Sequence, residues 1–306
     1  MPEPQTGLQP EPAQGRPAGG EPLPADALRR RSIRSAFERA ADSYDTAAQV
    51  QREICARLAR FGHPFAAATI PTLSREQPVR ALDAGCGTGF GLAQLDALCP
   101  PAQQFALDLA PAMLARARAR ARHPASAPAG PLPVCADLEH LPLRTASLAL
   151  YWSSLAVQWC APARVLDEAS RVLAPGGLAL VATLGPRTLW ELRTAFAAID
   201  NSRHTIDFHP IEHWSAAARA AGLAVLGSEC VELAAWAPDL RGLLRDIKSI
   251  GAATVDGGRR RGALGRQAWE NLQARYETHR RSDGQLPATY DVILLALRKP
   301  FPGSPT

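Results

Sequence analysis

Between residues 79 and 199 the sequence alternates short apolar runs with amphipathic stretches, and this rhythm restricts the fold more than any other feature. Apolar runs of strand length lie at 79–84, 103–108, 132–136, 147–152 and 178–184. Helical spacing lies between and after them, at about 89–98, 111–122, 161–173 and 187–199. Strands and helices in this alternation build a mostly parallel sheet with helices on both faces. We therefore expect an α/β fold.

Other patterns flank this core. Residues 1–27 are rich in Pro, Gly and Glu and nearly lack large apolar side chains, so we expect a disordered tail. Two helices are expected over 28–62, with a break at Ser43-Tyr44-Asp45 that puts Tyr44 on a loop. After residue 200 we expect helices at about 210–221, 238–250 and 264–279 and strands at 223–233 and 288–298. The two late strands would complete one edge of the same sheet.

The length of the chain fits one α/β domain with insertions or two small domains. The 306 residues are 46% apolar, which is enough for a large core. No apolar run reaches the roughly 18 residues that span a bilayer, and no secretory signal is present, so we expect a cytoplasmic protein. The net charge of +5 is mild, with only two lysines among the 34 basic residues. This arginine bias gives no reason to expect nucleic-acid binding.

The cysteines give no sign of a disulfide framework or a metal site. All six lie far apart, without a Cys-x-x-Cys pair: Cys55, Cys86, Cys99, Cys135, Cys160 and Cys230. No histidine pair at zinc-ligand spacing accompanies them. We expect free, buried thiols.

Three glycines follow the first expected strand and open the next helix. Gly85, Gly87 and Gly89 would let the backbone turn sharply and bring helical amide groups close to a ligand. Dinucleotide-binding loops place the third glycine one residue later, next to a pyrophosphate. Here Asp83 precedes the loop, and a carboxylate would repel a pyrophosphate but attract a cationic amine.

Two further acids occupy the ends of the second and third expected strands. Asp108 ends the second strand, where a carboxylate accepts hydrogen bonds from both hydroxyls of a ribose. Asp137 and Leu138 follow the third strand, where an acid can accept from an exocyclic amine and an apolar side chain can flank a purine. Three acids at successive strand ends together indicate an adenosine ligand.

The segments DAGCGTG, ALDLAPAML, ADLEHLPL and RVLAPGG, within residues 79–184, resemble the S-adenosylmethionine-dependent methyltransferases with a Rossmann-like fold. The resemblance implies a seven-stranded, mostly parallel sheet with an antiparallel last strand and a helical insertion near the C-terminal end. It also implies S-adenosylmethionine as the cofactor. The cofactor-binding residues would be Asp83, Gly85, Cys86, Gly87, Gly89, Asp108, Leu109, Met113, Asp137, Leu138 and Ser153.

Further segments, most of them outside residues 79–184, resemble one particular family of these methyltransferases. AFERAADSYDTAAQVQREI, SSLAVQWC, TLGPRTLWELRTAFAAID, LRDIKSIGA and LPATYDVIL are similar to the malonyl-acyl-carrier-protein O-methyltransferases of biotin synthesis, the BioC family. The resemblance implies methylation of the free carboxylate of a malonyl group on acyl carrier protein, with coenzyme A as the alternative carrier. One domain, 28–306, would then comprise a lid (28–62), a cofactor core (79–199), a substrate-side helical region (200–286) and a final strand (288–298). No nucleic acid or membrane partner is implied.

The same resemblance places Tyr44, Ser154, Gln158, Trp159, Arg164 and Lys248 at the substrate. A carboxylate is already ionised at pH 7, so no catalytic base is expected and the site would act by positioning alone. We expect a cation to select the carboxylate. Arg164 is one candidate, Arg171 is more typical of a structural residue, and Lys248 could instead help to dock the acidic carrier protein.

Other functions remain open from sequence alone. One is methylation of another small carboxylate or of a quinone, and a carbon-methylating enzyme would need a base that this chain does not obviously offer. Another is a non-methylating assembly factor of related sequence. The intact glycine loop and the late LRDIKSIGA and LPATYDVIL segments favour the malonyl reaction by resemblance.

Overall fold

The computed structural model describes residues 25–73, 79–100, 102–121, 130–200, 202–249 and 264–303. The expected disordered tail at 1–27 lies outside these ranges up to residue 24. Helix α1 (Ala25–Ala40) already occupies the last three residues of that range. None of the described helices is long and apolar enough to cross a membrane.

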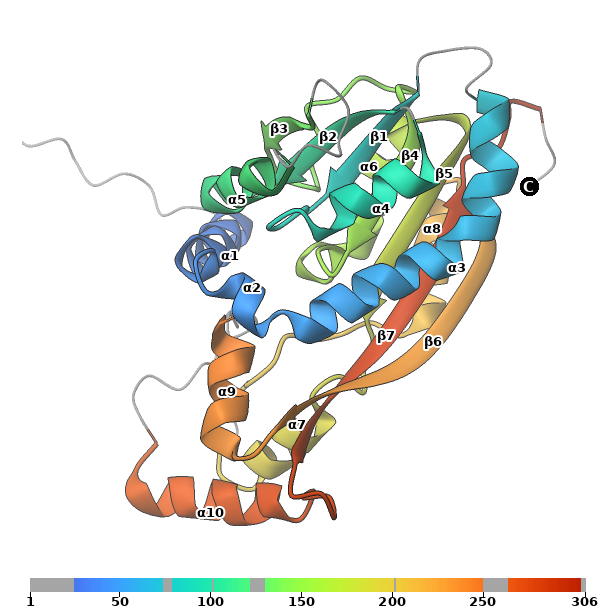
Figure 1. Cartoon of the computed structure of the whole chain (residues 1–306). Coiled ribbons are helices and arrows are strands. Elements are labelled where there is room, and N and C mark those ends of the chain that lie inside the picture. Colours follow the sequence, from blue (N-terminus) through green and yellow to red (C-terminus); the bar gives the residue numbers. More distant parts are fainter. Residues whose placement is uncertain are drawn as a thin grey trace, which may run out of the picture.

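One mixed sheet of seven strands forms the centre of the described chain (Figure 1). Its order is β3-β2-β1-β4-β5-β7-β6, and β7 runs antiparallel to both of its neighbours while the other pairs are parallel. The strands are β1 (Arg80–Ala84), β2 (Gln103–Asp108), β3 (Leu132–Cys135), β4 (Leu148–Ser154), β5 (Leu173–Leu184), β6 (Ala224–Ala237) and β7 (Leu286–Arg298). The expected fold class is confirmed, and β6 and β7 complete one edge as predicted.

The strand order fixes where a ligand can bind. From β1 the chain moves outward to β2 and β3, then returns to β4 on the other side of β1. Asp83 in β1 is level with Trp152 in β4, so the carboxyl ends of both strands meet at this reversal. Open α/β sheets bind ligands in the crevice outside such a switch point.

Helices cover both faces of the sheet (Figure 1). Helices α3 (Gln49–Leu73), α4 (Phe90–Leu98) and α5 (Pro111–Ala121) lie on one face, where α3 packs on β4 and β5. Helices α6 (Pro162–Val172) and α8 (Ile211–Ala220) cover the other face. Helices α7 (Trp190–Ala197), α9 (Leu240–Ser249) and α10 (Arg266–Glu277) gather around the end where β6 turns towards β7. This layering leaves the carboxyl ends of β1, β2 and β3 beneath α1.

Several boundaries differ from the sequence expectations. Helix α3 runs on to Leu73, through two prolines inside the helix. Strand β5 begins at Leu173 rather than at 178, because Leu173 pairs with Leu148 before an irregular step in the register. Tyr44 does not lie on a loop but begins the one-turn helix α2 (Tyr44–Ala47), which the bond from the Ala48 amide to the Tyr44 carbonyl closes at 2.9 Å.

The cysteines are free, as expected, but not all are buried. Cys55, Cys86 and Cys99 are buried, whereas Cys135 and Cys230 are exposed. The exposed pair belongs to β3 and β6, the two edge strands of the sheet, where one side of the strand has no neighbour.

Candidate active site

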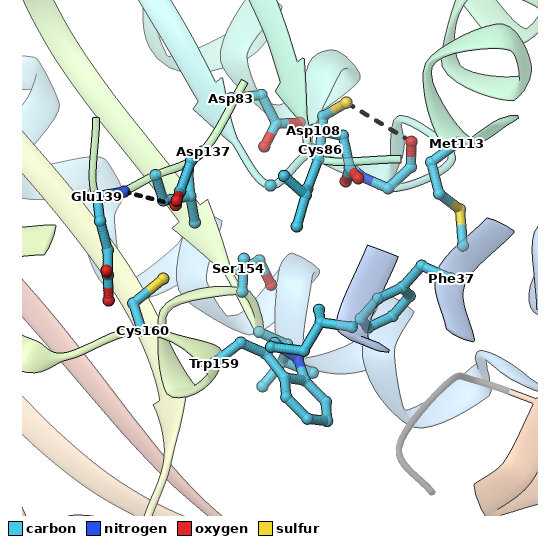
Figure 2. A pocket seen from close by; sticks show the side chains of 18 of the residues that line it. Phe37, Asp83, Cys86, Asp108, Met113, Asp137, Glu139, Ser154, Trp159 and Cys160 are labelled. Atoms are coloured by element: carbon cyan, nitrogen blue, oxygen red, sulfur yellow. Dashed lines mark hydrogen bonds between the residues drawn. The ribbon is translucent and has the colours of Figure 1, made fainter. Parts of the chain in front are cut away.

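A cavity of about 180 Å³ lies at the carboxyl ends of β1, β2 and β3. Figure 2 shows Asp83, Asp108 and Asp137 on one side of it and Phe37 and Trp159 on the other. Most of the residues expected to bind the cofactor line this cavity: Asp83, Gly85, Cys86, Gly87, Asp108, Leu109, Met113, Asp137 and Leu138. Two others, Gly89 and Ser153, do not.

The glycine loop has the backbone conformation that its sequence suggests. Gly85, Gly87 and Gly89 have φ values of 77°, 52° and 90°, in the left-handed region that strains other residues. A Cβ atom on Gly85 would also lie only 2.1 Å from the Cβ of Ala156, so any side chain at this position would clash with Ala156. Gly89 begins α4 and packs against Ala117 rather than facing the cavity.

Asp83 carries the strongest sign of a cationic ligand. Its side chain is 2% exposed, and its Oδ2 is buried without a hydrogen-bond partner among the described residues. Burial, together with the charge of Asp108, raises the pKa of Asp83 to about 8. Gly91, which sequence reasoning did not single out, leaves the space beside this oxygen, because a Cβ there would come within 2.5 Å of Oδ2. An ammonium group would supply the missing partner and stabilise the ionised carboxylate.

Asp108 holds the glycine loop and still has capacity for a ligand. Its Oδ2 accepts from the Gly87 amide at 2.9 Å and its Oδ1 from the Ala110 amide at 2.8 Å. Burial raises the pKa of Asp108 to about 6, and these amide bonds oppose the rise. Each carboxylate oxygen retains a second lone pair, so two neighbouring hydroxyls of a sugar could donate to it. The residues present therefore fit the nucleoside part of S-adenosylmethionine.

The third acid belongs to an ion-pair cluster. Arg30 on α1 lies 3.1 Å from Asp137 and 3.3 Å from Glu139. Arg164 lies 3.4 Å from Glu139 and 3.0 Å from Asp26. The cluster ties α1 to the loop after β3 and places Arg164 at the Asp137 end of the cavity.

Helix α1 roofs the cavity, and its contacts were not foreseen from sequence. Phe37 stacks edge-on against Trp159 with ring centroids 5.7 Å apart, and Arg29 donates to the Trp159 carbonyl at 2.9 Å. Asp45 in α2 accepts from the Thr88 hydroxyl at 2.6 Å, so the glycine loop is also fastened to this segment. The resemblance implied a lid over residues 28–62, but neither it nor the helical pattern indicated which side chains of α1 contact the cavity.

A second, smaller cavity of about 50 Å³ adjoins the first. Five residues line both cavities: Phe37, Tyr44, Gln51, Leu155 and Trp159. The φ of Leu155 is 57°, which turns the chain sharply at the end of β4. Gln158 faces only the second cavity. Other lining residues come from distant parts of the chain: Leu184, Thr188, Leu189, Thr205, Ile206, Phe208 and Tyr290. The second cavity therefore combines segments of the expected cofactor core with segments that lie outside it.

The remaining expected site residues lie elsewhere. Ser153 is fully buried and donates to the Ala84 carbonyl at 2.8 Å, which links β4 to β1. Ser154 lines the first cavity. Lys248 is exposed on α9 and lines neither cavity. Arg171, expected to be structural, pairs with Glu168 at 2.7 Å and donates to two backbone carbonyls of the segment between β3 and β4.

The fold and the first cavity define a methyltransferase. Residues 82–181 match the family model described as "Methyltransferase domain". Among solved structures, the chain is similar to one from the complex of the Haloferax volcanii Trm112 methyltransferase activator and its methyltransferase, with 20% identity, a TM-score of 0.52 and coverage of 89% of this chain and all of that one. It is also similar to the YcgJ protein of Bacillus subtilis, with 15% identity, a TM-score of 0.51 and coverage of 78% and 99%. At these identities the structures support the fold alone.

Curated relatives show which family of methyltransferases the chain belongs to. The malonyl-[acyl-carrier protein] O-methyltransferase of Dechloromonas aromatica is 46% identical over 267 residues, which cover 87% of this chain and 94% of that protein. The enzyme of the same name from Laribacter hongkongensis is 44% identical, with coverage of 85% and 86%. The biotin biosynthesis bifunctional protein BioHC of Cellvibrio japonicus is 36% identical over 90% of this chain and 51% of its own length. The chain belongs to the malonyl-[acyl-carrier protein] O-methyltransferase family.

Proposed function

We propose that this protein transfers the methyl group of S-adenosylmethionine to the free carboxylate of a malonyl group on acyl carrier protein, as an early step of biotin synthesis. The observation that carries the proposal is the 46% identity to a malonyl-[acyl-carrier protein] O-methyltransferase over 87% of the chain. That match extends well beyond the methyltransferase domain at 82–181, so it includes segments that build the second cavity.

The first cavity would hold the cofactor through its three acids. Asp83 would receive the amine of the methionine part, Asp108 the ribose hydroxyls, and Asp137 with Leu138 the adenine. Met113 and Leu109 would provide apolar contacts beside the nucleoside. When bound, S-adenosylmethionine supplies a methyl group made electrophilic by the adjoining sulfonium.

The second cavity would hold the acceptor in line with that methyl group. One carboxylate oxygen of the malonyl group forms a bond to the methyl carbon, and the bond from carbon to sulfur breaks, leaving a methyl ester and the neutral thioether S-adenosylhomocysteine. No proton is released, so the site needs no base. Holding the reactants in line can lower the barrier by roughly 7–11 kcal/mol. Tyr44, Leu155 and Trp159, which line both cavities, are placed to enforce this geometry.

The carrier protein would dock on α9. Arg241, Arg245 and Lys248 are exposed on α9, which packs against α2 next to Tyr44 (Figure 1). A row of cations at the rim of a site favours an acidic partner and speeds its association.

Incubation of the purified protein with labelled S-adenosylmethionine tests the proposal. Malonyl-carrier protein should accept label, whereas acetyl-carrier protein, which lacks the free carboxylate, should not. The labelled product should release methanol on mild alkaline hydrolysis, as an ester does. Label in neither acceptor, or equal label in both, would contradict the assignment.

A further inference from the structure

Two segments that resemble the family, AAQVQREI and LPATYDVIL, meet in the second cavity, where Gln51 of the first segment, which also lines the first cavity, faces Tyr290 of the second segment. Gln51 of α3 and Tyr290 of β7 both line the second cavity and are 8% and 5% exposed. The Gln51 amide is hydrogen-bonded to the Tyr290 hydroxyl, while the Gln51 carbonyl oxygen is buried without a partner among the described residues. Polar groups buried in this way at a cavity wall are typical of a site that recognises a polar ligand.

The described residues that line this cavity include no Arg, Lys or His. Arg187 and Arg193 flank Thr188 in the chain, but Arg187 pairs with Glu232 at 3.1 Å and Arg193 donates to the Thr188 carbonyl at 2.6 Å. Arg164 belongs to the ion-pair cluster at the far end of the first cavity. The expected cation beside the acceptor carboxylate is therefore not part of the described wall.

The polar groups in the described wall of the second cavity are neutral and include hydroxyls and amides. Tyr44, Gln51, Thr188, Thr205 and Tyr290 all line the cavity. Burial raises the pKa of Tyr290 to about 12 and also raises the pKa of Tyr44 well above its usual value. Both phenols therefore keep their protons at neutral pH and can donate hydrogen bonds to an anion.

We propose that Tyr290 and Gln51, assisted by the hydroxyls of Tyr44 and Thr188, bind the malonyl carboxylate through neutral hydrogen bonds rather than through a cation. This inference rests on the proposed function and names the groups that recognise its substrate. One chemical reason favours neutral donors over a cation. They are not left as unpaired buried charges once the product has become a neutral ester.

The closing experiment measures binding of malonyl-carrier protein and acetyl-carrier protein to the full chain in the presence of S-adenosylhomocysteine, which prevents turnover. Tyr290→Phe and Gln51→Met each remove the polar group and keep the bulk of the side chain. We expect each to lower the affinity for malonyl-carrier protein about tenfold or more. Binding of acetyl-carrier protein should change less than twofold in both variants, and binding of S-adenosylhomocysteine should change less than twofold in Tyr290→Phe, because Tyr290 does not line the first cavity.

Tyr276→Phe is the matched control. Its hydroxyl is also buried and donates to the Pro287 carbonyl at 2.8 Å, but it lines neither cavity, so malonyl affinity should be retained. The inference would be overturned by unchanged malonyl affinity in both Tyr290→Phe and Gln51→Met, or by a selective loss in Arg164→Gln instead. Either result would leave the proposed function standing. If the wild-type chain does not prefer malonyl-carrier over acetyl-carrier protein, the proposed function falls together with it.

Discussion

At the scale of single residues, Asp83 makes cofactor binding depend on pH. Its pKa of about 8 means that the free protein holds this carboxyl mostly protonated at pH 6 and about half ionised at pH 8. Only the ionised form attracts the ligand's ammonium group, so the affinity for S-adenosylhomocysteine should rise up to roughly tenfold per pH unit from pH 6 towards pH 8. The affinity should fall again only above the pKa of the ligand's own α-amino group, which the neighbouring carboxylate raises above that of a peptide N-terminus.

Calorimetric titration across pH 6–9 checks this expectation. Asp83→Asn removes this titrating group without changing the size of the side chain, so its weaker affinity should show only the small rise near pH 6 that Asp108, with a pKa of about 6, contributes. A variant that keeps the wild-type pH profile would show that another group controls the dependence.

Residue-level reasoning found the acids but not their surroundings. Asp83, Asp108 and Asp137 could be identified from the sequence because each lies at or just after the end of an apolar strand. Parallel strands bring their carboxyl ends to one edge of the sheet. Phe37 of α1, which contacts Trp159 above the first cavity, could not be identified, because a helical pattern does not reveal which of its side chains face a ligand site. Tyr290 could not be identified either, since its position depends on the pairing of β7 with β6, where Tyr290 lies opposite Leu233.

At the scale of elements, the ion pairs of α1 act as a latch over the first cavity. Arg30 bridges from α1 to Asp137 and Glu139, and its side chain is only one-third exposed. Partly exposed pairs of this kind contribute roughly 0.4–1 kcal/mol. Arg30→Gln should therefore increase the dissociation rate of S-adenosylhomocysteine about two- to fivefold and speed hydrogen exchange over residues 25–40. Stopped-flow displacement and exchange mass spectrometry measure these effects.

Arg34→Gln serves as the control for the latch. Arg34 is on the same helix, and among the described residues it pairs only within that helix, with Glu38 at 3.8 Å, so its loss should leave the dissociation rate unchanged. An equal effect of both substitutions would mean that helix stability, and not the bridge to the loop after β3, holds the roof in place.

Helix α9 is the element expected to meet the carrier protein. Arg245→Glu and Lys248→Glu should each lower kcat/KM for malonyl-carrier protein about three- to tenfold, with a weaker effect at high salt, because rim charges act mainly on association. Malonyl-coenzyme A turnover should change little. Arg219→Glu, an equal charge reversal on the exposed side of α8, should leave both substrates unaffected. Equal losses for the two acceptors would remove α9 from carrier recognition.

At the scale of the whole molecule, the sheet could be predicted because its pattern is local. Each strand-helix unit between residues 79 and 199 has its own apolar period, and a right-handed parallel arrangement follows from the alternation. The second cavity could not be predicted in the same way. It joins side chains from α3, the end of β4, the segment before α7, the loop before α8 and β7, and their meeting is set by tertiary packing.

The same packing means that cofactor binding should stabilise the entire chain. Residues 25–73 roof the first cavity through α1 and also pack on the sheet through α3 (Figure 1). At 100 times its Kd, S-adenosylhomocysteine should add about 2.7 kcal/mol to the free energy of unfolding, which corresponds to a rise in Tm of roughly 5–10 °C.

Asp108→Asn tests whether this stabilisation passes through the expected ribose site. The substitution removes one carboxylate acceptor, and a tenfold loss of affinity would reduce the added free energy to about 1.4 kcal/mol at the same ligand concentration. Differential scanning fluorimetry should then show about half the wild-type shift, whereas Lys248→Glu should retain the full shift. If Asp108→Asn also retains it, the nucleoside does not depend on this carboxylate. The glycine loop that Asp108 holds would then have to bind the ligand without it.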